Sequence, residues 1–233
     1  MPPAPADAEV VEAAEFPSGG LTLEGRLAYP EAGPARGAVV IAGPHPLLGG
    51  DVDNNVVAAL TAGLARRGFA ALAFNYRGVG RSTGPAPDVG DHLAEFWATS
   101  HAAVEPGYRD DFVAAVEYLR NVAGPAAPVG LVGYSFGCSL LPAAAGRSMV
   151  LIAPTVGTHD YEAFAAHAGP LLVIAPDGDF AADAAGLGRW FDRLPEPKRL
   201  LRGRWDDHFF RGHEDWLAET VAAFLTETMG GGR

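Results

Sequence analysis

The segment Gly133-Tyr134-Ser135-Phe136-Gly137 places a serine between two glycines, directly after the apolar run 129–132. A serine on a sharp strand-to-helix turn is held clear of a sheet, and glycines on both sides let neighbouring backbone pass close to it. Small residues in a helical pattern follow Ser135. The context therefore predicts a nucleophilic serine rather than an ordinary glycine-rich turn.

Such a serine needs partners, because its hydroxyl is a weak nucleophile near neutral pH. A histidine must accept its proton, and a buried carboxylate must fix the tautomer of that histidine. Acyl transfer also needs two donors aimed at the developing oxyanion, and the N–H of Phe136 is expected to be one. The other should come from the loop after residues 38–42. Pro44 and Pro46 have no N–H, so His45 and Leu47 are the nearby candidates.

The elements that must position these residues follow from the alternation of apolar runs with helical patterns. This alternation is typical of a mostly parallel sheet with helices on both faces, which is the fold class that we expect. The first two strands should form an antiparallel hairpin, and one helix should begin at a cap on Asp53 and stop at Gly68. Strands are expected at 10–16, 21–29, 38–42, 69–76, 129–132, 148–153, 171–175 and 198–201, and helices at 54–67, 109–121, just after Ser135, and 214–226.

Length and composition favour a single domain over residues 1–233, with 1–7 and 230–233 loosely held. The net charge is −11 and no run of Lys and Arg accumulates, so nucleic acid and anionic membranes are poor partners. No apolar stretch reaches the roughly 18 residues needed to cross a bilayer. The single cysteine, Cys138, and the lack of a secretory signal pattern predict a cytoplasmic protein.

Two further segments resemble motifs of a known family. The loop Gly43-Pro44-His45-Pro46-Leu47-Leu48-Gly49-Gly50 is similar to the His-Pro-His-Pro-x-x-Gly-Gly loop of small, cap-less bacterial α/β-hydrolases related to the dienelactone hydrolases. Residues 74–82 resemble the arginine–glycine turn of the same proteins. With the serine motif, the resemblance to the α/β-hydrolase superfamily extends over nearly the whole chain and implies no large cap domain. Gly43 stands where the related loops usually begin with histidine.

The resemblance also implies the remaining catalytic groups, which follow the serine in the order acid, then histidine. Asp179 falls on the position of the acid, with Asp177 as a rival. His208 lies in the histidine loop, between acidic and aromatic residues, and His213 is the nearest alternative. The resemblance assigns the second oxyanion donor to the N–H of His45. The side chain of His45 either contacts substrate or bridges the backbone of its loop.

The excursion 85–107 does not fit the alternation and could hold a short helix, 91–102, with Phe96 and Trp97. These rings either cover the site as a lid or pack on the core or in a dimer contact. Leu47, Tyr134, Phe96 and Trp97 are the residues expected to contact substrate.

No metal-binding or phosphate-binding spacing is present, so no metal or cofactor is expected. We interpret Cys138 as a buried, inert thiol, and Arg77 and Arg81 as residues that bond backbone carbonyls of their turn. The sequence thus predicts a serine hydrolase that cleaves a small or medium carboxylic ester or thioester, as a monomer or homodimer. Acyl transfer, lactonisation, a lyase or cyclase step, and a non-catalytic binding module remain alternatives.

Overall fold

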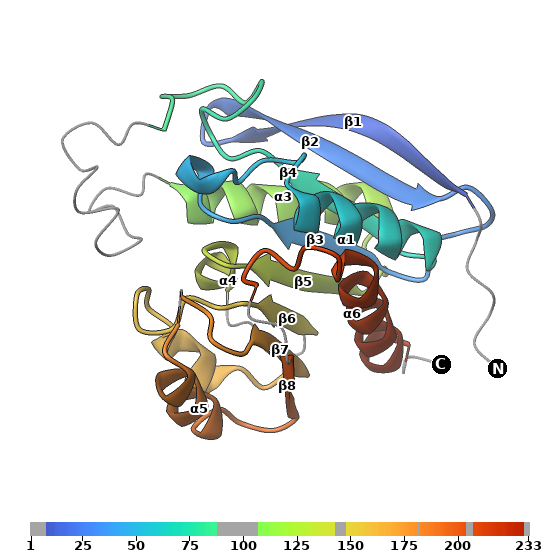
Figure 1. Ribbon diagram of the computed structural model, residues 1–233. Coiled ribbons are helices and arrows are strands. Elements are labelled where there is room, and N and C mark those ends of the chain that lie inside the picture. Colours follow the sequence, from blue (N-terminus) through green and yellow to red (C-terminus); the bar gives the residue numbers. More distant parts are fainter. Residues whose placement is uncertain (1–7, 88–106, 143–147, 181, 204–206, 231–233) are drawn as a thin grey trace.

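The computed structural model describes residues 8–87, 107–142, 148–180, 182–203 and 207–230. One sheet of eight strands runs through this part of the chain, in the order β1-β2-β4-β3-β5-β6-β7-β8 (Figure 1). Only β2 runs against its neighbours, as the expected opening hairpin requires. The strands are β1 (Glu9–Ser18), β2 (Leu21–Pro30), β3 (Ala38–Ala42), β4 (Ala70–Phe74), β5 (Val129–Tyr134), β6 (Met149–Ile152), β7 (Leu171–Pro176) and β8 (Lys198–Gly203).

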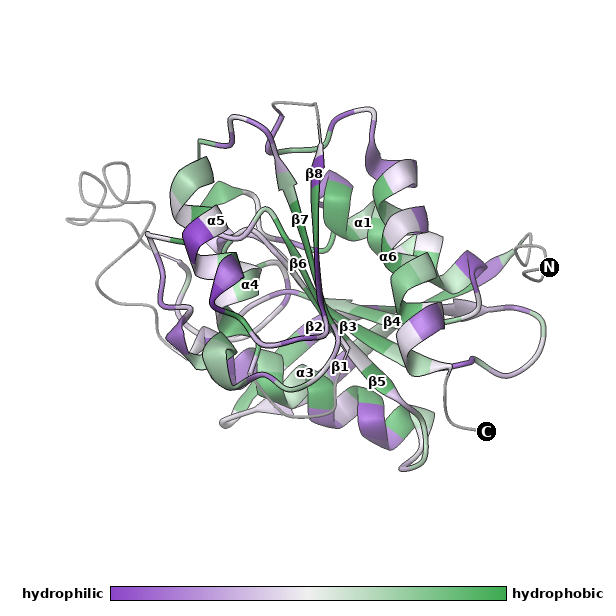
Figure 2. Ribbon diagram, turned by 90° about the horizontal axis from the view of Figure 1, so that it is seen from below, coloured by the Kyte–Doolittle hydropathy of each residue, from purple (hydrophilic) through white to green (hydrophobic). Residues whose placement is uncertain are grey.

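Helices cover both faces of this sheet, and the central strands between them are mostly apolar, whereas the edge strand β8 carries hydrophilic residues (Figure 2). On one face lie α1 (Asn55–Arg66) and α6 (Glu214–Met229), which pack with the strands into one buried apolar cluster. On the other lie α3 (Tyr108–Ala123), α4 (Gly137–Leu140) and α5 (Ala184–Asp192), which pack into a second cluster. The expected fold class, with a mostly parallel sheet between two helical layers, is confirmed.

The connection between β6 and β7 contains only a short 3-10 helix, η3 (Glu162–Ala166). It has no room for a bulky inserted domain, so the expectation of no large cap is confirmed. Strands β3, β5, β6, β7 and β8 are mutually parallel and end at the same edge of the sheet. Loops that follow the carboxyl ends of such strands are where sites are built in open α/β sheets.

Helix α1 shows a cap that the sequence interpretation assigned wrongly. The side chain of Asn54, not Asp53, accepts the N–H groups of Val56 and Val57. Asp53 is instead an exposed partner of Arg26, at 2.6 Å. The expected stop at Gly68 is present, with a φ of 89°.

Helix α5 was not predicted, because Gly186 and Gly188 weaken its helical pattern. Asp183 nevertheless caps it through the N–H groups of Ala185 and Gly186. The expected helix at 91–102 and residues 1–7 and 231–233 lie outside the described residues.

The two arginines of the turn after β4 bond carboxylates rather than the carbonyls that we expected. Arg77 donates from its guanidinium to Asp111, at 2.7 Å, and from its backbone N–H to the second oxygen, at 3.0 Å. Asp111 is fully buried and also accepts the hydroxyl of Ser18. Arg81 pairs with Glu24. A buried carboxylate needs such a counter-charge, so the Arg77–Asp111 pair fastens the turn to the start of α3.

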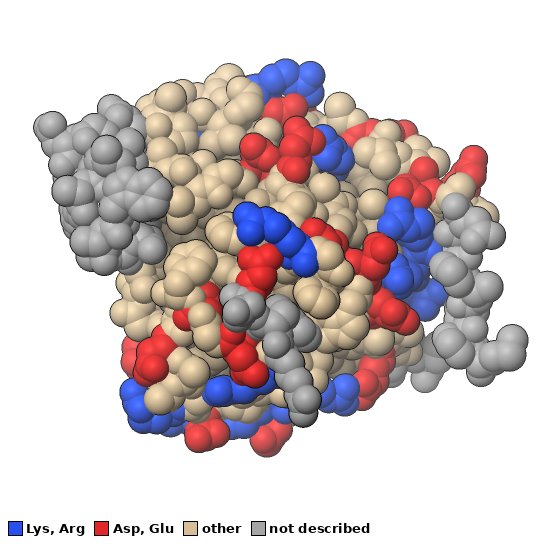
Figure 3. All heavy atoms as spheres, viewed as in Figure 1, with Lys and Arg blue, Asp and Glu red and all other residues tan. Residues whose placement is uncertain are grey.

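Acidic and basic side chains are interspersed over the described part of the face in Figure 3, and no extended basic area gathers there. Among the described residues, the helices are too short or too polar for a membrane span.

Candidate active site

Ser135 lies at the carboxyl end of β5, on a sharp turn that requires glycine at positions 133 and 137. Its φ is 55°, a left-handed conformation that is unusual for a non-glycine residue. A Cβ on Gly133 would lie 2.6 Å from the Cα of Cys138, and one on Gly137 would lie 2.3 Å from the carbonyl oxygen of Ala42. The N–H of Ser135 donates to Ile152, at 2.8 Å. Both glycines are therefore required by close backbone contacts, which hold the strained serine in place.

His208 and Asp179 meet this serine from the loops after β8 and β7. His208 Nε2 lies 3.0 Å from Ser135 Oγ, and His208 Nδ1 lies 2.8 Å from Asp179 Oδ1. The side chains of His208 and Asp179 are each only 5% exposed, so water does not compete for the hydrogen bond between them. With Nδ1 donating to the carboxylate, Nε2 is left to accept the proton of the serine.

The two rivals of these residues lie elsewhere. Asp177 is exposed, and its backbone N–H donates to Gly203 at 3.1 Å, which extends the pairing of β7 with β8. His213 is exposed and stands at the N-terminus of α6. The geometry thus joins Ser135 to His208 and Asp179, and not to either rival.

The loop that carries His208 is held from both sides. Partial burial of the Asp207 carboxylate opposes its ionisation, but the N–H groups of Phe209 and Arg211 donate to it and together lower its pKa. From below, the hydroxyl of Tyr134 donates to the carbonyl of His208, at 3.1 Å. Burial raises the pKa of Tyr134, so this hydroxyl stays protonated and available as a donor.

This bond corrects the expectation that Tyr134 contacts substrate. Tyr134 is the last residue of β5 and is 1% exposed, and its ring packs against the rings of His208 and Phe210. It has no surface to offer to a substrate, and it positions His208 instead. This role could not be predicted from the sequence, because the partner of the hydroxyl is a backbone carbonyl in a distant loop.

The loop after β3 forms the 3-10 helix η1 (Pro46–Leu48), capped by His45. His45 Nδ1 accepts the N–H of Leu47, at 3.2 Å, which leaves the His45 N–H as the better candidate for the second oxyanion donor. The ring of His45 is buried against that of Phe136, 4.8 Å between centroids. The side chain thus bridges its own loop backbone, one of the two roles considered for it. A Cβ on Gly50 would lie 1.9 Å from the oxygen of Pro44, which explains the glycine there.

Of the other residues expected at the site, Leu47 and Cys138 are among the described residues. Leu47 is half-buried within η1, in the loop after β3, whereas Phe96 and Trp97 lie outside the described residues. Cys138 is fully buried behind Ser135, with its Sγ 3.1 Å from the oxygen of Gly133, and burial raises its pKa. The inert thiol that we expected matches this environment.

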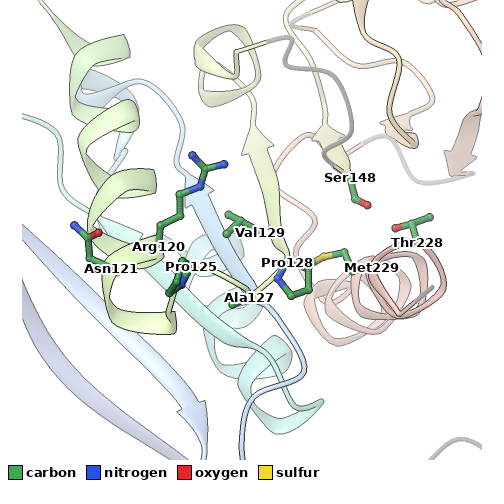
Figure 4. Close-up of a pocket in the computed structure, with 9 residues that line it drawn as sticks. All are labelled: Arg120, Asn121, Pro125, Ala127, Pro128, Val129, Ser148, Thr228 and Met229. Carbon is green, nitrogen blue, oxygen red and sulfur yellow. The ribbon is translucent and has the colours of Figure 1, made fainter. Parts of the chain in front are cut away.

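A hollow of about 680 Å³ lies at the opposite edge of the sheet, between α3 and α6 (Figure 4). It is lined by Val129, the first residue of β5, whereas Ser135 follows the last residue of that strand. No group of three or more histidine, cysteine or acidic residues that could hold a metal ion occurs in the described ranges.

Comparisons with known proteins extend this description. A family model described as alpha/beta hydrolase fold matches residues 47–202. An uncharacterised protein of Rickettsia prowazekii (strain Madrid E) is 26% identical over 219 residues, which cover 87% of this chain and 84% of that protein. A solved structure from Xanthomonas campestris, described as an α/β serine hydrolase without lid, is 24% identical with a TM-score of 0.75, and covers 93% of this chain and 94% of its own.

A second structure, an α/β serine hydrolase homologue from Coxiella burnetii, is 23% identical with a TM-score of 0.72. The match covers 92% of this chain and 97% of that one. At these identities the two structures show a shared fold over nearly the full length of each protein.

Proposed function

Because this chain belongs to the alpha/beta hydrolase fold family, we propose that it hydrolyses a small or medium carboxylic ester or thioester through an acyl-enzyme on Ser135. The observation that carries the proposal is the continuous chain of hydrogen bonds from Ser135 through His208 to Asp179. The description of the Xanthomonas campestris relative as a serine hydrolase without lid supports it.

In the first half of the reaction, Ser135 Oγ attacks the substrate carbonyl carbon while its proton moves to His208 Nε2. The carbonyl oxygen becomes an oxyanion, and the N–H groups of Phe136 and His45 bind it. Donors of this kind each contribute about 3 to 4 kcal/mol to the transition state. The carboxylate of Asp179 stabilises the imidazolium of His208. When the tetrahedral intermediate collapses, His208 returns the proton to the leaving oxygen or sulfur.

In the second half, a water molecule gives a proton to His208 Nε2 and attacks the acyl carbon. The bond between that carbon and Ser135 Oγ breaks, and the serine regains its proton from His208. The acid is released and the enzyme is restored. The connection between β6 and β7 places no bulky domain over the site that could enclose a long lipid chain, and this supports the choice of a small or medium substrate.

The test is intact-mass labelling with a small fluorophosphonate on wild type, Ser135→Ala and His208→Ala. We expect one adduct per wild-type chain, none on Ser135→Ala, and a large loss of labelling rate on His208→Ala. Ester and thioester panels then identify the acyl group. Folded wild-type protein that is neither labelled nor active on any ester would overturn the proposal.

A single-turnover experiment tests whether water resolves the acyl-enzyme. With a 4-nitrophenyl ester, release of nitrophenol should precede release of the acid, and the acylated mass should disappear in buffer alone. An acylated serine that is stable in water and is discharged only by an added alcohol or amine would instead identify a transferase.

A further inference from the structure

Two exposed phenylalanines stand beside the base of the triad. Phe180 is 68% exposed and Phe209 is 37% exposed, although both are large apolar side chains. The centroid of the Phe180 ring lies 4.7 Å from that of His208 and 6.1 Å from that of Phe209. We call these two rings the aromatic ledge.

The ledge is held by the same backbone that holds the triad. Phe180 directly follows Asp179 and Phe209 directly follows His208, so the bond between acid and base also sets the spacing of the two rings. The backbone carbonyl of Phe209 accepts from Asn55, at 2.9 Å. The loops are thus anchored, while the Phe180 ring is largely open to solvent and the Phe209 ring is partly open, with the guanidinium of Arg211 4.6 Å from its centroid.

The chemistry of acyl transfer determines which part of the substrate lies next to the aromatic ledge. The acyl carbon must lie at Ser135 Oγ, and its oxyanion must point toward the N–H groups of Phe136 and His45. His208 must deliver its proton to the leaving atom, so the leaving group extends along the ring of His208. The ledge borders this same ring.

We propose that Phe180 and Phe209 form the leaving-group subsite, and that the enzyme prefers esters or thioesters whose alcohol or thiol carries an apolar, above all an aromatic, group. This inference rests on the proposed hydrolase function. Single exposed apolar side chains are common on protein surfaces. Two that adjoin each other, one after the catalytic acid and one after the base, form a surface that an apolar leaving group covers.

The test compares benzyl acetate with 2-methoxyethyl acetate, whose alcohols have similar acidity and whose acyl group is the same. Only the leaving group differs, so kcat/KM reports contacts with that group, and deacylation is common to both. Wild type should prefer the benzyl ester. Phe180→Ala and Phe209→Ala should each lower kcat/KM for the benzyl ester by about fivefold to tenfold, which is the typical effect of a ring–ring contact, and change the methoxyethyl ester less than twofold.

Two controls separate contact from structural damage. Val122→Ala removes an exposed side chain near the end of α3, 52% exposed, and should change neither ester. Phe180→Trp keeps an aromatic surface and should retain the preference. Labelling by a fluorophosphonate, whose leaving group is fluoride, should proceed at the wild-type rate in Phe180→Ala, because the triad is intact.

Equal losses on both esters in Phe180→Ala and Phe209→Ala, or a wild type that does not distinguish the esters, would refute the subsite while the hydrolase function stands. A wild type that is unlabelled and inactive on both esters overturns the hydrolase function, and the subsite with it. The fluorophosphonate result therefore distinguishes the two failures.

Discussion

The hydrogen bond of 2.8 Å between Asp179 Oδ1 and His208 Nδ1 predicts how the substitution Asp179→Asn changes activity. In Asp179→Asn the side chain keeps its shape but loses its charge, and its amide can donate to Nδ1. The proton of a neutral His208 then moves to Nε2, which faces Ser135 Oγ at 3.0 Å. That nitrogen can no longer accept the proton of the serine. Because both side chains of the pair are only 5% exposed, solvent does not restore the lost interaction.

The expected loss in kcat/KM is about 10⁴-fold, the size found where the same exchange was made in a serine protease. At about 1.36 kcal/mol per factor of ten, this corresponds to about 5.4 kcal/mol of transition-state stabilisation. The chain supplies a matched control two residues earlier. Asp177 belongs to the same loop but is exposed, and Asp177→Asn should leave kcat/KM within about twofold, as is usual for surface substitutions.

The assay is the initial rate of 4-nitrophenyl acetate hydrolysis, together with the rate of fluorophosphonate labelling. Thermal unfolding of each variant shows whether the fold is kept. An Asp179→Asn enzyme within tenfold of wild type would refute the assignment of the acid. If Asp177→Asn lowered kcat/KM as much as Asp179→Asn does, the loop would tolerate neither substitution. The experiment would then not support Asp179 over Asp177 as the acid.

Four further outcomes test the residues beneath the site and the fold around it. Gly137→Ala should lower the free energy of unfolding in urea by about 3 kcal/mol and abolish labelling, because the new Cβ meets backbone at 2.3 Å. Gly188→Ala, inside α5 and facing only the end of an arginine side chain, should raise that free energy by about 0.5 to 1 kcal/mol. Tyr134→Phe should lower kcat about tenfold with KM unchanged, because the carbonyl of His208 loses its buried donor. The thiol of Cys138 should resist iodoacetamide in the native protein and react fully in denaturant, which thiol titration measures.

Much of the fold was predictable because the strands of a covered parallel sheet are continuous apolar runs. Ala38–Ala42 was placed with its exact bounds, and every residue of it is buried. The serine turn was also predictable, because a side chain at position 133 or 137 would collide with neighbouring backbone, so only glycine fits at either position. Local steric demands of this kind leave their mark directly in the sequence.

Contacts between residues far apart in the sequence could not be predicted in this way. Arg77 and Asp111 are 34 residues apart, and Tyr134 and His208 are 74 apart. In both cases the residue type is compatible with several partners, and only the folded chain selects one. The cap of α1 is Asn54 rather than Asp53, one residue later than expected. Capping propensity cannot distinguish the two positions, because Asn and Asp are both good caps.

The site thus separates into residues that hold the chemistry and residues that can vary without disturbing it. Tyr134 and Gly137 lie beneath the triad, where a change of one atom meets packed backbone or a buried carbonyl. Phe180 and Phe209 lie above it and extend into solvent, although each adjoins a member of the triad in the chain. Substitution at these two positions alters what covers His208 while the hydrogen bonds to Ser135 and Asp179 persist. A fold built in this way can change the leaving group that it prefers without rebuilding the groups that break the bond.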